Sequence, residues 1–224
     1  MLRSEPWRSR LGAIALAILA HVPSRERRRS VAALDREGWS AANPGVAGDA
    51  SVTATPITGL AKASGHIRAE IIDQVDAARR TSSRVERILL AGEPPAVVSA
   101  YCSWLMVDES QITTAGLDDG ADVTWDFDQP APSSLGAFDL VISQAIIEHL
   151  VDPFGHVTAL FELLGSGGTL IVQTVIPGFP YHRYPVDCVR FFPDWFELVA
   201  ARVGAEVVGR YCDDLRICYS FRRP

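Results

Sequence analysis

Apolar residues follow two alternating patterns through most of this chain, one typical of buried strands and one typical of helices. The clearest strand-type segment is FDLVI at residues 138–142, which is apolar apart from one acid and lies between turn-forming residues. A run of this kind indicates a strand buried on both faces. We expect the strand to end at Ser143 or Gln144 and a helical segment to follow over residues 145–150. Because open α/β sheets bind ligands at the carboxyl ends of their strands, we expect Gln144, Glu148 and His149 to lie at a functional edge.

Further strands and helices are predicted on both sides of this segment. The other predicted strands are residues 85–91, 104–107, 121–125, 169–174, 207–211 and 216–221. The predicted helices are residues 94–100, 154–164 and 193–203. This alternation indicates an α/β fold with a doubly wound, mostly parallel sheet that helices cover on both faces. The last two strands are neighbours in sequence, so we expect them to pair antiparallel.

The first 80 residues have a different character. Residues 1–29 favour one or two helices, residues 40–59 are rich in small and turn-forming residues as a linker is, and residues 67–75 have helical spacing. We therefore expect an N-terminal helical extension and linker over residues 1–80, followed by one α/β domain over residues 81–224. The extension is also the expected contact for a second copy of the chain or a partner chain.

Composition narrows the classes of function. The net charge of −6 offers no overall attraction to nucleic acid. No Cys or His spacing resembles a metal site, and four cysteines without a CxxC pair are typical of reduced thiols, so we predict no metal and a cytoplasmic location. Apolar residues 11–22 follow basic residues, as in an export signal, but no cleavage site follows and the run is too short to span a bilayer. We predict a packing helix there and no stable membrane insertion.

Three segments resemble one enzyme family. They are FDLVISQAIIEHLVDP at residues 138–153, LFELLGSGGTLIV at residues 160–172 and YHRYPVDCVRFFPDWF at residues 181–196. Together they are similar to class I S-adenosylmethionine-dependent methyltransferases of type 11 or type 23. The resemblance implies a Rossmann-like doubly wound sheet with an antiparallel C-terminal strand pair, and S-adenosyl-L-methionine as the cofactor.

The same resemblance implies where the cofactor binds. In the family, an acid that ends the second strand binds the ribose hydroxyls, and a polar residue that ends the third strand reads the adenine amino group. With strands predicted to end there, Asp108 corresponds to the ribose acid and Asp126 to the adenine reader. Ser143 and Gln144, at the end of the fourth strand, complete the expected cofactor contacts.

The glycine-rich turn after the first strand departs from the family pattern. Only Gly92 remains of its glycines, and Pro94 and Ala96 stand where the second and third are expected. Proline has no backbone N–H to donate, so this turn offers a cofactor carboxylate fewer hydrogen bonds. Glu93 is expected to pair with the cofactor's amino group in compensation.

Two histidines are the candidates for acid–base chemistry. His149 follows the fourth strand and imidazole titrates near neutral pH, so we predict a general base; the alternative is a structural histidine bonded to nearby backbone. His182 is the second catalytic candidate, within a segment that is expected to cover the acceptor. The expected acceptor contacts in that segment are Tyr181, Tyr184, Asp187 and Arg190. The alternative there is architectural, with Asp187 and Arg190 paired across one turn.

These patterns support two hypotheses of different classes. The first is a methyltransferase that methylates a hydroxyl of a small molecule or sugar, without nucleic acid. The second is a catalytically inactive methyltransferase-like module that serves as a binding or partner subunit, which the altered glycine turn favours. A nicotinamide-dependent enzyme is a weaker third reading, because the chain also lacks the G-x-G-x-x-G motif of that class.

Overall fold

The structure is a computed structural model that describes residues 67–81, 85–182 and 186–224. Its strands are β1 Ile88–Ala91, β2 Ile112–Gly116, β3 Val123–Thr124, β4 Phe138–Gln144, β5 Leu164–Val175, β6 Glu206–Cys212 and β7 Arg216–Arg222. Its helices are α5 Ala69–Thr81, α6 Val98–Leu105, α7 Pro153–Glu162 and α8 Pro193–Val203, with 3₁₀ turns η1 Pro95–Val97, η2 Glu109–Gln111 and η3 Ile147–His149. The helices predicted at residues 1–29 and the linker at 40–59 lie outside the described residues.

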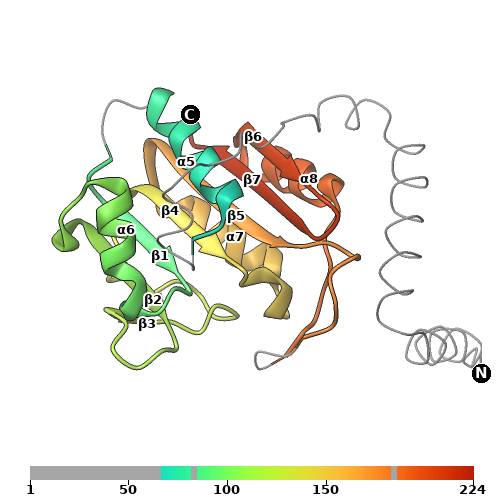
Figure 1. Cartoon of the computed structure of the whole chain (residues 1–224), viewed down its shortest axis with the longest axis horizontal. Helices are drawn as coiled ribbons and strands as arrows, with labels where there is room; N and C mark the ends of the chain where they lie inside the picture. Colours follow the sequence, from blue (N-terminus) through green and yellow to red (C-terminus); the bar gives the residue numbers. More distant parts are fainter. Residues whose placement is uncertain (1–66, 82–84, 183–185) are drawn as a thin grey trace, which may run out of the picture.

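The strands of the described residues form one sheet in the order β3-β2-β1-β4-β5-β7-β6 (Figure 1). Neighbouring strands from β3 across to β5 are parallel, and β7 runs antiparallel to both β5 and β6. The predicted fold class is therefore confirmed: a doubly wound, mostly parallel sheet with an antiparallel C-terminal pair.

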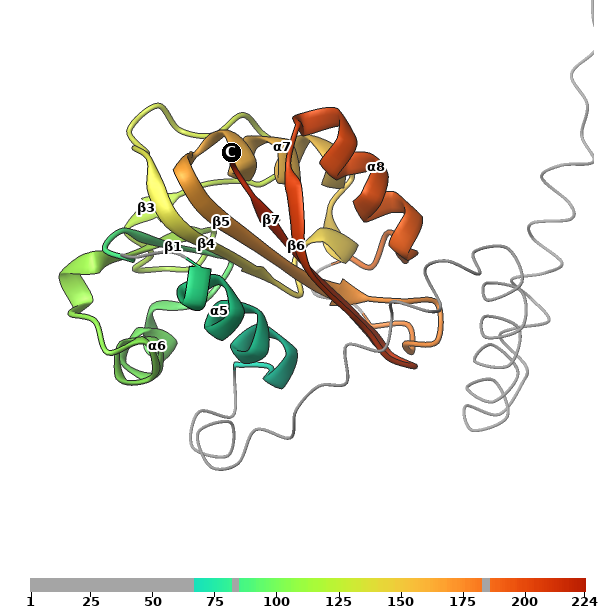
Figure 2. The ribbon, with the colours of Figure 1, turned by 90° about the horizontal axis from the view of Figure 1, so that it is seen from above.

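Helices cover both faces of this sheet, with α5 and α6 on one face and α7 and α8 on the other (Figure 2). Successive side chains of a central strand enter opposite cores. In β4, Val141 packs in the core beneath α7 and α8, whereas Ile142 packs in the core beneath α5 and α6. Leu170 and Ile171 divide in the same way in β5. This two-sided burial explains why residues 140–142 of β4 and 170–172 of β5 are continuously apolar rather than alternating.

The strand predicted at residues 104–107 is wrong. Tyr101, Trp104 and Leu105 are buried at helical spacing and belong to α6, which ends where Met106 adopts a left-handed φ of 55°. The second strand is instead β2, whose Ile-Thr-Thr start favours a strand. Asp108 consequently lies before β2, at the amino end of that strand.

The helix predicted at residues 145–150 is also wrong in extent, because only the short turn η3 forms there. Ala145 has a φ of 53°, outside the helical region, and its N–H donates to the carbonyl of Gln173 on β5. The next helix, α7, begins later, where Asp152 accepts a hydrogen bond from Gly155 N and Pro153 occupies the first turn. The predicted helix at residues 193–203 is confirmed as α8.

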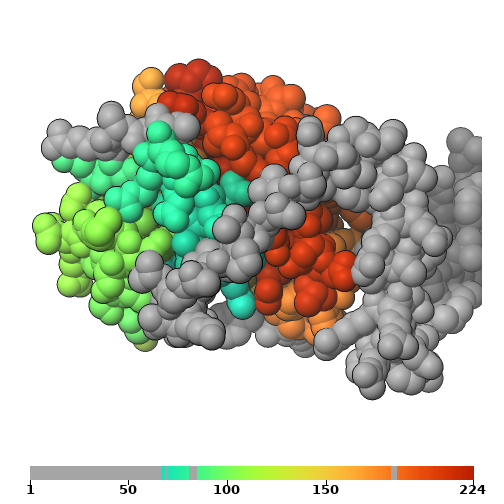
Figure 3. Space-filling view, turned by 45° about the horizontal axis from the view of Figure 1, so that its top comes forward, coloured from blue at the N-terminus to red at the C-terminus, as the bar shows by residue number. Residues whose placement is uncertain are grey.

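Helix α5 falls in the region predicted as an extension, yet it packs on the sheet. Its Ile71, Ile72 and Val75 are buried in the same core as β1 and β4. Gln74 accepts a 2.5 Å hydrogen bond from Ser220 of β7. In the space-filling view, α5 lies between the segment that contains α6 and the C-terminal segment (Figure 3). Residues 69–81, which were expected to belong to the extension, thus pack as part of the α/β domain.

Candidate functional site

The carboxyl ends of the parallel strands meet at one edge, where two regions can be distinguished. One is the turn after β1, next to the ends of β2 and β3. The other is a cavity of about 280 Å³ beyond the ends of β4 and β5. The cavity is lined by Arg68, Ala145, Glu148, His149, Gln173, Val175, Phe179, His182 and Arg216. Gln144 joins the two regions, because its amide donates to Glu93 at 2.8 Å and its Oε1 accepts from Arg68 N.

The turn after β1 requires glycine at its first position. Gly92 has a φ of +89°, and its N–H donates to the carbonyl of Ala115 at 2.8 Å. A Cβ on Gly92 would lie 2.5 Å from Cγ1 of Ile146, closer still to its Cδ1, and 3.5 Å from Phe127. Apolar side chains therefore rest directly against the glycine at which the family brings backbone close to its cofactor.

Glu93, predicted to meet the cofactor's amino group, faces inward in this structure. It is buried, and its Oε1 accepts hydrogen bonds from the Tyr101 hydroxyl at 2.9 Å and from Gln144 Nε2 at 2.8 Å. Burial, together with the neighbouring carboxylate, raises the pKa of Tyr101 well above its ordinary value, so the phenol stays a donor. Glu93 thus ties the turn to α6 and β4.

The structure separates the two acids that were predicted to bind the nucleoside. Asp108 does not end a strand as predicted, because it lies at the amino end of β2, where its N–H donates to Gln111 Oε1 at 3.0 Å. Asp126 follows β3 at the carboxyl edge, and its Oδ1 accepts from Asp128 N at 3.1 Å. Asp118, which the sequence analysis missed, follows β2 in an exposed turn. The β-branched residues at the start of β2 could have identified this strand, and the position after its end would then have pointed to Asp118.

Ser143, the other predicted cofactor contact on β4, is fully buried beneath α7. Its hydroxyl lies 3.4 Å from Nε2 of His156, a buried histidine that packs against Trp125 and Phe127. Burial lowers the pKa of His156 to about 3, and Asp128 offsets this only in part. His156 is therefore a neutral core residue near neutral pH.

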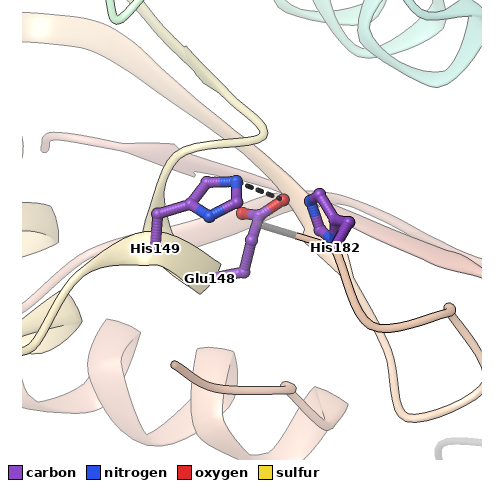
Figure 4. Close-up of side chains that lie close together, drawn as sticks. All are labelled: Glu148, His149 and His182. Carbon is purple, nitrogen blue, oxygen red and sulfur yellow. Dashed lines mark ion pairs between the residues drawn. The ribbon is translucent and has the colours of Figure 1, made fainter. Parts of the chain in front are cut away.

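Three side chains converge on the cavity beyond β4 and β5: Glu148, His149 and His182 (Figure 4). His149 Nδ1 lies 2.5 Å from the carbonyl of Val186. Since a carbonyl only accepts, Nδ1 carries the proton and the lone pair of the neutral ring is on Nε2, 3.9 Å from Glu148 Oε1. His149 therefore makes the backbone hydrogen bond of the structural alternative through Nδ1, while Nε2 keeps the lone pair that a general base needs.

The segment that carries His182 is held by an ion pair. Asp187 is almost fully buried and is bonded by Arg190 through both guanidinium nitrogens and by His182 N at 2.7 Å. Burial raises the pKa of Asp187, but these hydrogen bonds and charges more than offset it, so the pKa lies below its ordinary value. Tyr181 is 69% exposed, and Tyr184 lies outside the described residues. The contacts of Asp187 and Arg190 match the architectural alternative.

Comparison with known proteins identifies the fold. No family model matches the chain. A chain of the complex between the Haloferax volcanii Trm112 methyltransferase activator and a methyltransferase superposes with a TM-score of 0.53 at 12% identity, covering 74% of this chain and 94% of that one. The CcbJ methyltransferase from Streptomyces caelestis gives 0.52 at 13%, covering 68% and 96%. The N-terminal domain of EvdMO1 with bound S-adenosylhomocysteine gives 0.51 at 14%, covering 68% and 81%.

A search of the described residues for a helix long and apolar enough to cross a membrane finds none. The type 11 or type 23 assignment stays a prediction. The strand order, the antiparallel C-terminal pair and these superpositions together show that the chain has the fold of the class I S-adenosylmethionine-dependent methyltransferases.

Proposed function

We propose that this chain is a methyltransferase that uses S-adenosyl-L-methionine and methylates a hydroxyl group of a small molecule or sugar. The observation that supports this most is the position of His149. Its Nε2 carries a lone pair at the wall of a cavity beyond β4, next to the strand ends where methyltransferases of this fold hold their cofactor. The bound S-adenosylhomocysteine of the EvdMO1 domain supports the choice of cofactor.

The residues at the strand ends fit this cofactor in part. Gly92 has the positive φ that the turn requires, and Asp126 and Asp118 offer carboxylates after β3 and β2 for the nucleoside. Pro94 and Pro95, in contrast, cannot donate backbone hydrogen bonds. We therefore propose that the nucleoside contacts, rather than the methionine contacts, supply most of the affinity.

When bound, the cofactor supplies an electrophilic methyl group on a sulfonium. The chain then has to place the acceptor hydroxyl in line and remove its proton. We assign the proton to His149 Nε2, because the bond from Nδ1 to Val186 fixes the tautomer and the ring orientation. His182, 4.9 Å away between ring centroids, forms the opposite wall and is the second proton-transfer candidate.

Isothermal titration with S-adenosylhomocysteine tests the proposal without knowledge of the acceptor. We expect saturable binding that Asp126→Ala weakens about tenfold, the loss of one charged hydrogen bond. Asp108→Ala is the matched control, and it should leave the affinity unchanged because that acid lies at the opposite edge of the sheet. Absence of heat at millimolar ligand would reject cofactor binding.

A second function is favoured by the contacts at Gly92. Ile146 and Phe127 rest against the glycine, and Glu93 is bonded inward, so the turn is already filled. A methyltransferase-like partner subunit without cofactor is consistent with these contacts, and residues 1–66 offer a segment for contact with a second copy or another chain. Light scattering and co-purification test it, since this function requires a stable complex together with a blank cofactor titration. The cytoplasmic location stays a prediction.

A further inference from the structure

We propose that Glu148, His149 and His182 bind one divalent transition-metal ion, with Zn²⁺ as the first choice. The donor atoms of these three residues lie within 4.8 Å of one another at the wall of the cavity beyond β4 and β5. Figure 4 shows the two imidazole rings on either side of the Glu148 carboxylate. They come from η3 and from the segment after β5, so only the folded chain brings them together. This proposal replaces the expectation from sequence that the chain holds no metal.

The Glu148 carboxylate has an unsatisfied oxygen. Its side chain is fully buried, its Oε2 accepts a 2.7 Å hydrogen bond from the Thr174 hydroxyl, and its Oε1 has no hydrogen-bond partner. The contact of Oε1 with His149 Nε2 at 3.9 Å is too long for a hydrogen bond. A buried carboxylate oxygen without a hydrogen bond is costly, because it has lost its water and gained no hydrogen bond in exchange. His182 Nδ1 is buried and makes no hydrogen bond, and the Asp187 carboxylate lies 3.4 Å from it. A cation between the three residues would satisfy the carboxylate directly.

The surroundings of the two histidines are those of metal ligands. His149 donates from Nδ1 to the carbonyl of Val186, which leaves Nε2 as the donor toward Glu148. Metal-bound histidines usually hold their other nitrogen in this way, by a backbone carbonyl or a carboxylate. For His182, the Asp187 carboxylate is placed to hold the other nitrogen, because its Oδ2 lies 3.4 Å from His182 Nδ1. In this arrangement His182 Nε2 would bind the ion.

The donor set selects the class of ion. Two imidazoles and one carboxylate, with an open fourth position, match catalytic zinc sites, whereas Mg²⁺ and Ca²⁺ prefer oxygen ligands. Two ligands of a tetrahedral ion at about 2.1 Å lie about 3.4 Å apart. The 3.9 Å between His149 Nε2 and Glu148 Oε1 therefore needs to shrink by about half an ångström. The limit of 4.8 Å on the separations among the three donor atoms means that no pair has to close by more than about 1.4 Å. The cavity leaves room for a water or a hydroxyl as fourth ligand.

Two cationic side chains also line the cavity, Arg68 and Arg216. They oppose a cation, but Arg68 is exposed and Arg216 is half-buried, so solvent and salt screen their charges. The Glu148 carboxylate is fully buried and screened much less. The electrostatic potential at the three donor atoms is therefore set mainly by the Glu148 carboxylate, and it favours a cation.

Metal binding does not depend on methyl transfer, although both use the same cavity. A bound ion would take the His149 lone pair, so His149 would then not be the base. The ion would instead lower the pKa of an acceptor hydroxyl bound to it, and solvent would take the proton of that hydroxyl. The cofactor titration and the metal titration have independent outcomes. A chain that does not bind the cofactor could still bind the metal, and the reverse also holds.

The test is a titration of the EDTA-treated full chain with ZnCl₂, followed by Co²⁺ substitution. We expect one Zn²⁺ per chain, with an affinity that Glu148→Gln and His182→Gln each weaken at least tenfold. Glu148→Gln keeps the side-chain shape and the bond to Thr174, so the fold should persist, as circular dichroism will show. Cys188→Ser is the control against an adventitious thiol site, because this exposed thiol lies 3.6 Å from the His149 carbonyl and is not among the three donors. It should leave the affinity unchanged.

The Co²⁺ form should show the visible bands of a tetrahedral nitrogen and oxygen site without a thiolate charge-transfer band. Three results would overturn the proposal. They are the absence of saturable Zn²⁺ binding, equal affinity in the wild-type chain and both ligand variants, and loss of binding in Cys188→Ser.

Discussion

Acid should destabilise this protein through one buried histidine. His156 is 2% exposed, lies against Trp125 and Phe127, and has a pKa lowered from 6.5 to about 3, chiefly by burial. Between these two values the unfolded chain binds a proton that the folded chain does not. Stability therefore rises with pH in this window, is lost as pH falls through 6.5, and the loss levels off below about pH 3.

The magnitude follows from the two pKa values. At pH 5, protonation of the unfolded chain at this residue costs about 2 kcal/mol relative to pH 8, and at pH 4 the cost grows to about 3 kcal/mol. Other titrating groups contribute to the total pH dependence of unfolding. They cancel when the wild-type chain is compared with a His156→Phe variant, which removes the titrating ring but keeps an aromatic side chain.

Urea unfolding of both proteins at pH 8 and pH 5 provides the assay. The difference in unfolding free energy between wild type and His156→Phe should change by about 2 kcal/mol between the two pH values, in favour of the variant at pH 5. A difference that stays constant within about 0.5 kcal/mol would refute the reasoning, because His156 would then titrate alike in the folded and unfolded chains.

Two further predictions concern backbone and charge at the same edge of the sheet. Gly92→Ala should destabilise the fold by about 2 kcal/mol or more in urea unfolding, because it combines a left-handed φ with overlap of Ile146. Ile146→Ala in that background should recover part of the loss, and no recovery would show that only the φ matters. Asp187→Asn should cost roughly 3 kcal/mol, since it leaves the Arg190 guanidinium without its charged partner. A thermal midpoint equal to that of the wild type would contradict this.

The fold could be predicted from the sequence where burial is two-sided or helical spacing is clear. The continuous apolar runs of β4 and β5 and the Pro193 start of α8 indicate these elements directly. Residues 104–107 were wrongly predicted as a strand because Trp104 and Leu105 also suit a strand. Only Tyr101, one turn earlier, shows that they belong to the buried face of a helix. The sequence did not predict strand β2, because β2 is short and ends in Ala and Gly, which have low strand propensity.

The candidate site was harder to predict, since it depends on which strand ends are neighbours. The mistaken second strand led to Asp108 as the expected ribose acid, although this residue lies before β2 rather than after it. Glu148 and His182 are distant in sequence, and no metal-binding motif joins them. Their convergence arises from a crossover of the chain through α7 and β5, which a spacing argument cannot reveal.

Hydrogen exchange with and without S-adenosylhomocysteine tests most directly whether the carboxyl edge of the sheet binds the cofactor. We predict slower exchange in peptides that cover residues 88–97, 112–128 and 143–149, with no change in α7 and α8. Unchanged exchange in the first two regions at saturating ligand, or protection confined to α7 and α8, would contradict it.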